Sequence, residues 1–222
     1  MKLKNNIKLL IAADGGAGSG KTTASKLLTK KYSLKLLSSG ILYRYVALKL
    51  LNAKKIKSLN LFLKKITKNI TLKDLKNKNL YNPEVTEYTS RIAKTKRIRD
   101  CLKSYQKNFA KNKLCIIEGR DIGTVVIPKK ADLKLFFKCS LNIKAKRRFE
   151  EYRKTNKKIS FNEVKKAIKL RDSNDSKRKI SPLKPAKDAV IVDTSKVNKK
   201  QMLTKLSKIV EEKLKEKYGR NL

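Results

Sequence analysis

The stretch Asp14-Gly15-Gly16-Ala17-Gly18-Ser19-Gly20-Lys21-Thr22-Thr23 decides the fold of this chain. It fits the pattern G-x-x-x-x-G-K-[ST], whose glycines let successive backbone N–H groups turn inward around an anion. The apolar run from Ile7 to Ala13 before it is typical of a buried strand. From Lys21 onward the apolar spacing is helical, with one face formed by Ala24, Leu27, Leu28 and Tyr32. A strand, a glycine loop and a helix in this order predict a phosphate-binding loop at a helix N-terminus.

Each part of this loop has an expected task. We expect the triphosphate to be bound by Gly15, Gly16, Ala17, Gly18, Ser19, Gly20, Lys21, Thr22 and Thr23. The Lys21 ammonium should reach the outer phosphates, and the Thr22 hydroxyl should hold Mg²⁺. A glycine-rich turn that merely precedes a helix is the alternative interpretation, and it leaves the lysine, the threonine and both flanks to chance. The loop therefore predicts a nucleoside triphosphate with Mg²⁺ as its cofactor.

The composition excludes several classes of site. The 222 residues contain no histidine, so a histidine-based triad, general base or metal site is ruled out. Cys101, Cys115 and Cys139 are odd in number and far apart, which disfavours a zinc site or a disulfide framework and suggests a reducing compartment. The net charge of +41 is compatible with a polyanion partner, but the lysines are spread along the chain without interleaved aromatic residues. We therefore favour compositional drift over a dedicated nucleic-acid surface.

The first thirteen residues resemble a signal peptide, because Lys2, Lys4 and Lys8 precede the short apolar run Leu9-Leu10-Ile11. However, the phosphate loop follows at once, and cleavage would remove its strand. No apolar run approaches the ~18 residues of a membrane span. We expect this segment to be the first core strand of a cytoplasmic protein that does not enter a membrane.

The arginines are the scarcer and more informative cations, since 11 arginines stand against 48 lysines. A chain that uses lysine wherever any cation serves should keep arginine where a planar, bidentate fork is needed. Most of the arginines fall in a few places, namely Arg44, Arg97, Arg99, Arg120, Arg147, Arg148, Arg171 and Arg178. For a protein that already holds a triphosphate, these guanidinium groups predict a second phosphorylated ligand.

The rest of the chain alternates between short apolar runs and longer amphipathic stretches. The runs predict strands at 34–37, 114–117, 132–138 and 189–192. The stretches predict helices at 41–51, 83–111, from 142, 161–170 and 202–218, with Ser39 as an N-cap and Gly219 as a stop. Residues 52–83 suggest a peripheral insertion, and residues 171–178 a polar loop or a frayed helix end. This alternation predicts an α/β fold with a parallel sheet and helices on both faces.

Acids and an arginine follow the predicted strand at 114–117, in the stretch Glu118-Gly119-Arg120-Asp121-Ile122-Gly123-Thr124. Ligands collect at this edge of open α/β sheets. A triphosphate loop with arginines at several strand ends predicts phosphoryl transfer between two bound phosphate-bearing molecules. Such a transfer needs alignment, Mg²⁺ and positive charge around the moving group. If the acceptor is itself a phosphate, it is already a nucleophile at neutral pH, so no histidine base is required.

Four blocks make the chain resemble the bacterial cytidylate kinases, which are P-loop nucleoside monophosphate kinases. They are Asp14-Gly15…Gly20-Lys21-x-Thr23; Ser39-Gly40-Ile41-Leu42-Tyr43-Arg44; Glu118-Gly119-Arg120-Asp121-Ile122-Gly123-Thr124-Val125-Val126-Ile127-Pro128; and Arg171-Asp172-x-x-Asp175-x-x-Arg178 with Ser181-Pro182-Leu183. The resemblance spans nearly the whole chain, and the third block is specific to this family. It implies transfer of the γ-phosphoryl group of ATP to CMP or dCMP, giving CDP or dCDP plus ADP, in pyrimidine nucleotide metabolism.

The resemblance also implies how the base is read. Asp121 would accept from the cytosine amine, while Arg99 and the Ser90 hydroxyl would address the ring acceptors. Uracil would turn a carbonyl toward Asp121, and the two facing acceptors would discriminate by ~1–3 kcal/mol. The CMP-binding set implied by the resemblance is Ser39, Arg44, Ser90, Arg99, Arg120, Asp121, Arg171, Asp175 and Arg178.

Within that set, Arg44, Arg120 and Arg178 would grip the monophosphate, and Asp175, held by Arg171, would accept from sugar hydroxyls. The implied catalytic set is Lys21, Arg120, Arg147, Arg148 and Arg178. The resemblance implies a single P-loop kinase domain over 1–222, with a shortened monophosphate-binding insertion at 59–83 and a lid at 147–182. Lid closure would bring arginines onto the ATP phosphates and exclude water.

The sequence departs from the family pattern at a few positions. Gly16 stands where proline is usual, and Asn174 and Ser176 stand where lid arginines are usual. Two alternatives stay open: a kinase of the same fold for UMP, AMP or shikimate, and a basic nucleic-acid-binding P-loop protein with steeply salt-dependent affinity. We expect a monomer whose partners are ATP and CMP or dCMP, with no specific nucleic acid.

Overall fold

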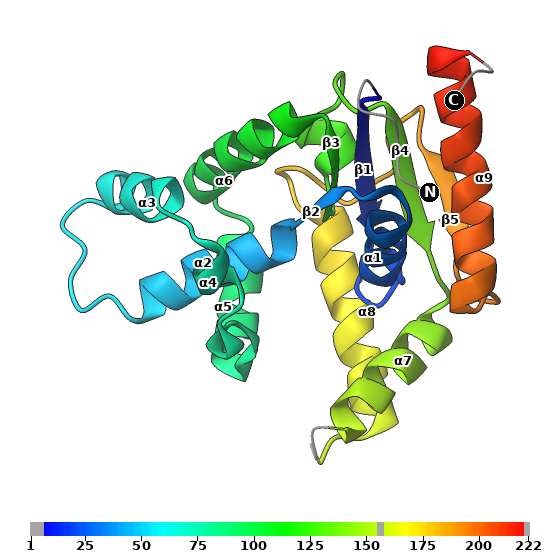
Figure 1. Ribbon diagram of the computed structural model, residues 1–222. Helices are drawn as coiled ribbons and strands as arrows, with labels where there is room; N and C mark the ends of the chain where they lie inside the picture. Colours follow the sequence, from blue (N-terminus) through cyan, green and yellow to red (C-terminus); the bar gives the residue numbers. More distant parts are fainter. Residues whose placement is uncertain (1–6, 155–157, 220–222) are drawn as a thin grey trace. The chain divides into compact units, whose positions relative to one another are not determined.

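The computed structural model describes residues 7–154 and 158–219 of the 222-residue chain (Figure 1). Predictions for the other residues, including 155–157 of the expected lid, lie outside this description. The described residues form two compact units. The first unit comprises the described residues of Met1–Leu36 and Lys113–Leu222, and the second comprises Leu37–Asn112. The second unit includes the whole of the insertion expected at 59–83.

A five-stranded sheet with the order β2-β3-β1-β4-β5 organises the first unit. The strands are β1 (Leu9–Gly15), β2 (Lys35–Ser38), β3 (Leu114–Gly119), β4 (Leu133–Lys138) and β5 (Val190–Asp193). The central strand β1 pairs in parallel with β3 and β4, and β4 pairs in parallel with β5. Parallel strands bring their carboxyl ends to one edge, so the residues after β1 and β3 lie together there.

Among its described residues, the first unit has four α-helices: α1 (Lys21–Tyr32), α7 (Leu141–Arg153), α8 (Phe161–Lys177) and α9 (Lys199–Tyr218). Capping boxes begin two of them, at Ser160 for α8 and Asn198 for α9. Gly219 follows α9 with a φ of 78°, which confirms the predicted stop. Helix α1 packs against α9, and α7 packs against α8. A single π-helical turn, η3 (Ile122–Val126), follows β3.

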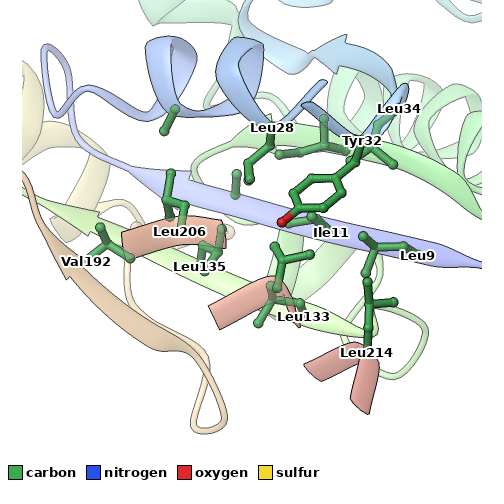
Figure 2. Packing of buried hydrophobic residues seen from close by; sticks show 14 of the residues in the cluster. Leu9, Ile11, Leu28, Tyr32, Leu34, Leu133, Leu135, Val192, Leu206 and Leu214 are labelled. Carbon is green, nitrogen blue, oxygen red and sulfur yellow. The ribbon is translucent and has the colours of Figure 1, made fainter. Parts of the chain in front are cut away.

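The main core lies between one face of the sheet and the helix pair α1 and α9 (Figure 2). Alternate residues of β1, Leu9 and Ile11, point into it, together with Leu133 and Leu135 of β4. Helix α1 contributes Tyr32, which is fully buried and whose hydroxyl donates to Glu211 of α9 at 3.0 Å. The other face of the central strands is buried as well, at Leu10, Ala12, Cys115 and Ile117. Continuous apolar runs fit strands covered on both faces, which confirms the predicted α/β class.

The second unit is helical apart from the end of β2. It comprises α2 (Ser39–Leu51), α3 (Leu59–Lys68), α4 (Leu72–Leu75), η1 (Lys78–Tyr81), α5 (Pro83–Ile92), α6 (Lys96–Phe109) and η2 (Ala110–Asn112). Helix α2 packs against α5, and α3 packs against α6. None of the helices in the described part of the chain is long and apolar enough to cross a membrane.

Three local predictions are wrong. The single helix expected at 83–111 is two helices, because Thr95 has an extended backbone with ψ of 118° that ends the helical run. Helix α8 continues to Lys177, so residues 171–177 are neither a loop nor frayed. The N-cap of α2 is Ser38, and Ser39 is the first helical residue. Its hydroxyl instead accepts from Nε2 of Gln106 at 2.5 Å.

Candidate active site

The loop between β1 and α1 has the backbone that its glycines predict. Gly18 and Gly20 adopt φ of 68° and 80°, a region that favours glycine. Gly20 precedes α1, and among the described residues no side chain caps the first turn of this helix. Its backbone N–H groups and the positive end of the helix dipole are therefore directed at the loop. This arrangement suits an anion.

Lys21 lies under the loop, and its Nζ donates to the Gly16 carbonyl at 3.4 Å. Burial lowers the pKa of Lys21 to about 7, and the Arg120 guanidinium adds repulsion, while Glu118 partly opposes both. The burial behind this shift distinguishes Lys21 from a solvated surface charge and makes it a candidate functional group.

The next residue, Thr22, donates its hydroxyl to Oε1 of Glu118 at 3.1 Å. Glu118 is 2 % exposed, and its Oε2 has no hydrogen-bond partner in the described part of the chain. No group of three or more acidic or cysteine side chains arranged for a metal occurs among the described residues. Mg²⁺ needs only one or two protein oxygens when a nucleotide supplies the rest, so the pair Thr22 and Glu118 fits it.

Asp14, at the end of β1, holds the segment that follows β3. Its Oδ1 accepts the N–H of Ile122 at 2.8 Å, and its Oδ2 accepts the N–H of Gly123 at 2.7 Å. Burial raises the pKa of Asp14 to about 6, although these two hydrogen bonds act in the opposite direction. The carboxylate thereby fixes the backbone that carries Arg120 and Asp121. Sequence reasoning assigned Asp14 no role, although an acid at the end of a buried strand was a usable signal.

Arg120 and Arg178 meet around Asp175. The Arg120 Nε donates to Oδ2 of Asp175 at 2.8 Å, and the Arg178 Nη1 lies 3.4 Å from its Oδ1. Arg178 also places Nη2 3.8 Å from Oδ1 of Asp121. Burial alone would raise the pKa of Asp175, but Arg120, then Arg178 and Arg171, hold it below its usual value. The structure thus brings together five of the expected CMP-binding residues at the sheet edge: Arg120, Asp121, Arg171, Asp175 and Arg178.

Arg147 and Arg148 of α7 line a cavity of about 180 Å³ beside the phosphate loop. Its other lining residues are Gly18, Ser19, Gly20, Lys21, Thr22, Thr23 and Glu151. Arg147 donates from Nη2 to the Thr194 carbonyl at 2.7 Å and from Nη1 to the Thr194 hydroxyl at 3.2 Å. That hydroxyl donates in turn to the Ser19 carbonyl at 2.9 Å, so Arg147 is tied to the loop through the residue after β5. Arg148 instead pairs with Glu151 at 2.8 Å.

The second unit carries the remaining expected residues. Arg44 donates from Nη1 to the Leu80 carbonyl at 2.8 Å and to Oγ1 of Thr86 at 2.7 Å. Arg99 is buried, donates to the Ala93 carbonyl at 2.9 Å and lies over the Tyr43 ring at 5.6 Å.

Both arginines connect helices of this unit. Arg44 of α2 contacts η1 and α5, and Arg99 of α6 contacts the break between α5 and α6. Ser90 is exposed on α5. Ser39 is buried against Gln106, an interaction that the sequence did not reveal.

A phosphate loop after the central strand of a parallel sheet, with a perturbed lysine and paired arginines at the same edge, defines a P-loop phosphotransferase. Comparison with known proteins narrows this class. The sequence model of the family described as cytidylate kinase matches residues 11–212. The chain therefore belongs to the cytidylate kinase family.

Individual relatives agree with this assignment. The chain is 40% identical over 213 residues to the cytidylate kinase of Thermosipho melanesiensis, covering 92% of this chain and 98% of the relative. It is 38% identical over 220 residues to the cytidylate kinase of Thermotoga neapolitana, with the same coverage of 92% and 98%. A solved structure of an uncharacterized Eubacterium ventriosum protein shares the fold, with a TM-score of 0.58 at 14% identity over 93% of this chain and 99% of that one.

Proposed function

We propose that this protein transfers the γ-phosphoryl group of ATP to CMP or dCMP, giving ADP and CDP or dCDP. The observation that carries the proposal is the arginine and carboxylate cluster of Arg120, Asp121, Asp175 and Arg178, at the same sheet edge as Lys21. A P-loop explains binding of the donor, whereas this cluster supplies groups for a second anionic and hydrogen-bonding ligand. Membership in the cytidylate kinase family supports the identity of that ligand.

On the donor side, the loop N–H groups and the α1 N-terminus bind the ATP phosphates, and Lys21 takes its full positive charge beside them. A pKa near 7 means that Lys21 is readily protonated when the negative triphosphate arrives. Thr22 and Glu118 would hold Mg²⁺. When bound, Mg²⁺ neutralises charge on the phosphates.

On the acceptor side, Arg120 and Arg178 bind the monophosphate of CMP, as does Arg44. Asp175 exchanges its arginine partners for sugar hydroxyls, and Arg171 keeps its charge compensated. The monophosphate attacks the γ-phosphorus directly, because it is already ionised at neutral pH and needs no base. We also propose Ser39 as a member of this group, through the hydroxyl that Gln106 orients.

The base is read by the donor and acceptor pattern of cytosine. Asp121 accepts from the exocyclic amine, and Arg99 and Ser90 donate to the ring acceptors. Arg99 and Asp121 are both buried, which supports this reading of the base, because unpaired polar groups discriminate most strongly away from water.

We propose that residues 147–182 act as the lid, with Arg147 and Arg148 acting on the transferring phosphate, and that 59–83 belongs to the monophosphate-binding region. The helix pair of α7 and α8 supplies a packed element that can move as one body. A single functional domain and a monomeric state in the cytoplasm complete the proposal.

The experiment is a panel of acceptors combined with one change at the base-reading position. Wild-type protein with ATP and Mg²⁺ should phosphorylate CMP and dCMP far faster than UMP or AMP. Asp121→Asn should lower kcat/KM for CMP by about 10²-fold. It should also raise the ratio of kcat/KM for UMP to that for CMP, since Asn can donate to a carbonyl. Asp100→Asn, at an exposed acid of α6, is the control and should leave the ranking unchanged. Activity on AMP with none on CMP would contradict the proposal.

A further inference from the structure

A carboxylate from α8 is bound to the phosphate loop. The Ala17 N–H donates to Oδ1 of Asp172 at 2.8 Å. The other carboxylate oxygen, Oδ2, pairs with Nζ of Lys144 on α7 at 2.7 Å. Both side chains are mostly buried, with 19 % of Asp172 and 15 % of Lys144 exposed. The contact joins residues 155 positions apart in the chain, and the helix pair α7 and α8 therefore meets the loop through a charged group.

Two loop glycines make room for this contact. A Cβ on Gly16 would lie 2.6 Å from Oδ2 and 2.9 Å from Oδ1 of Asp172, closer than real Cβ contacts allow. A Cβ on Gly18 would lie 3.3 Å from the Cβ and the carbonyl oxygen of Lys144. Of these two glycines, only Gly18 has a positive φ, so at Gly16 a side chain would meet the Asp172 carboxylate rather than an unfavourable backbone conformation. The loop and α8 fit each other at Gly16 and Asp172.

This contact conflicts with the task of the loop. Backbone N–H groups of a phosphate loop attract anions, and Asp172 uses one of them for its own negative charge. A triphosphate brought to the same loop meets that carboxylate at short range, where repulsion between like charges is only partly screened because Asp172 is mostly buried.

We propose that Asp172 is an internal competitor for the phosphate loop: it holds the Ala17 N–H until ATP binds, and ATP displaces it. The inference rests on the proposed function only in taking the loop as the ATP site. Displacement turns or shifts α8, which carries Asp175 one helical turn further on. Asp175 in turn accepts from Arg120, which follows β3. Binding of ATP is thereby linked to the arginine that we assign to the acceptor.

Asp172→Asn tests the competition, because it keeps the size of the side chain and removes its charge. We expect the Kd of ATP, and that of ADP, measured by calorimetry without acceptor, to fall about tenfold, which corresponds to ~1.4 kcal/mol. The matched control is Asp132→Asn. Asp132 also accepts a backbone N–H, from Leu10 at 2.8 Å, and pairs with a lysine, Lys217, at 2.6 Å, but at the opposite end of β1. Its exposed fraction is 18 %, and its substitution should leave both affinities unchanged.

Gly16→Ala provides an independent route to the same displacement. The added methyl group should expel Asp172 and also tighten ATP binding, whereas in the Asp172→Asn protein it should add little. This non-additivity, measured as a double-mutant cycle, separates competition from two unrelated effects on the loop. Thermal unfolding of each variant establishes that it is folded before its affinity is compared.

The outcomes distinguish this inference from the proposed function. Weaker ATP binding by Asp172→Asn would mean that Asp172 supports the loop, and would overturn the competition while CMP phosphorylation persists. Unchanged affinity in both variants would overturn it too. Absence of ATP binding by the wild-type protein would instead remove the proposed function itself.

Discussion

The two ends of the central strand β1 use similar groups for different purposes. At the amino end, Lys217 of α9 pairs with Asp132 at 2.6 Å. Partial burial opposes it, but the hydrogen bond to Asp132 raises the pKa of Lys217. At the carboxyl end, burial and Arg120 lower the pKa of Lys21 to about 7. Folding therefore stabilises the charged form of Lys217 and destabilises the charged form of Lys21.

This difference separates groups that hold the fold from groups kept ready for a ligand. For Lys217, the raised pKa adds stability below the unfolded pKa of about 10.4, and this is lost as pH rises through the folded value. For Lys21 the sign is reversed: between about pH 7 and 10.5 the unfolded chain binds more protons, so stability rises with pH. Charged Lys21 at the carboxyl end of β1 therefore lowers the free energy of unfolding near neutral pH. Binding of an anionic ligand beside Lys21 can offset this loss.

The largest expected effect is that of Lys21→Met. Loss of the ammonium should lower the phosphoryl-transfer rate by about 10²–10³-fold, because a preorganised positive charge at the phosphates disappears. The variant should nevertheless be more stable than wild type toward urea at pH 7, and the difference should shrink at pH 9, where wild-type Lys21 is largely neutral.

Lys217→Met is the matched control at the amino end. It should keep the transfer rate within about twofold, since only a partly exposed pair is lost. Equal losses of activity in the two variants would contradict the assignment of different roles to the two ends of β1.

Arg120→Lys is expected to have the next largest effect. Lysine keeps the charge but cannot reproduce a guanidinium fork that donates to Asp175 and to a phosphate together, so kcat/KM for CMP should fall by about 10²-fold. Steady-state kinetics with CMP varied at saturating ATP measures this. Arg91→Lys, at an exposed arginine of α5, should behave as wild type. Near-normal turnover by Arg120→Lys would mean that the scarcity of arginine carries no information.

The sequence was most informative where the chemistry of the backbone dictates the residue. Gly18 and Gly20 are required by positive φ, and Lys21 and Thr22 follow at fixed positions, so the loop could be placed within its strand and helix. The buried strand β3 and the acids after it could also be predicted, because an apolar run bounded by charged residues has few other interpretations.

Contacts between distant residues set the limit of prediction. Helix α8 was ended too early, because a polar run such as 171–177 favours helix only when its carboxylates find Lys144 and Arg120, which lie 28 and 55 positions away from their partners. Ser39 was taken for a cap because Ser38 and Ser39 at the start of α2 both suit that role, and only the contact of Ser39 with Gln106 distinguishes them. The helical spacing of apolar residues continues across the break between α5 and α6, so this spacing did not predict the break.

Asp14→Asn should have an intermediate effect that depends on pH. An amide offers one acceptor where two backbone N–H groups need it, so the Arg120 segment loosens and kcat for CMP should fall about tenfold at pH 7.5. The raised pKa also has a consequence for stability. Between pH 3.8 and about 6 the folded protein binds more protons than the unfolded chain at this site, so Asp14 lowers stability as pH rises through that range. Urea unfolding of Asp14→Asn should lack this contribution, and an unchanged pH slope would contradict the assignment.

The smallest effect is expected for Tyr218→Phe, at the amino end. The Tyr218 hydroxyl donates to the Lys8 carbonyl at 2.9 Å and accepts the Lys8 N–H at 2.9 Å, and both groups are exposed enough for water to replace them. The free energy of unfolding should fall by about 1 kcal/mol or less, with kcat and both KM values unchanged. Because Tyr218 ties the last turn of α9 to the start of β1, a change in KM for ATP would show that the two ends of this strand are coupled. Unchanged kinetics would mean that only the carboxyl end of β1 contributes to catalysis. That end carries Asp14 and Lys21, whose pKa values are shifted.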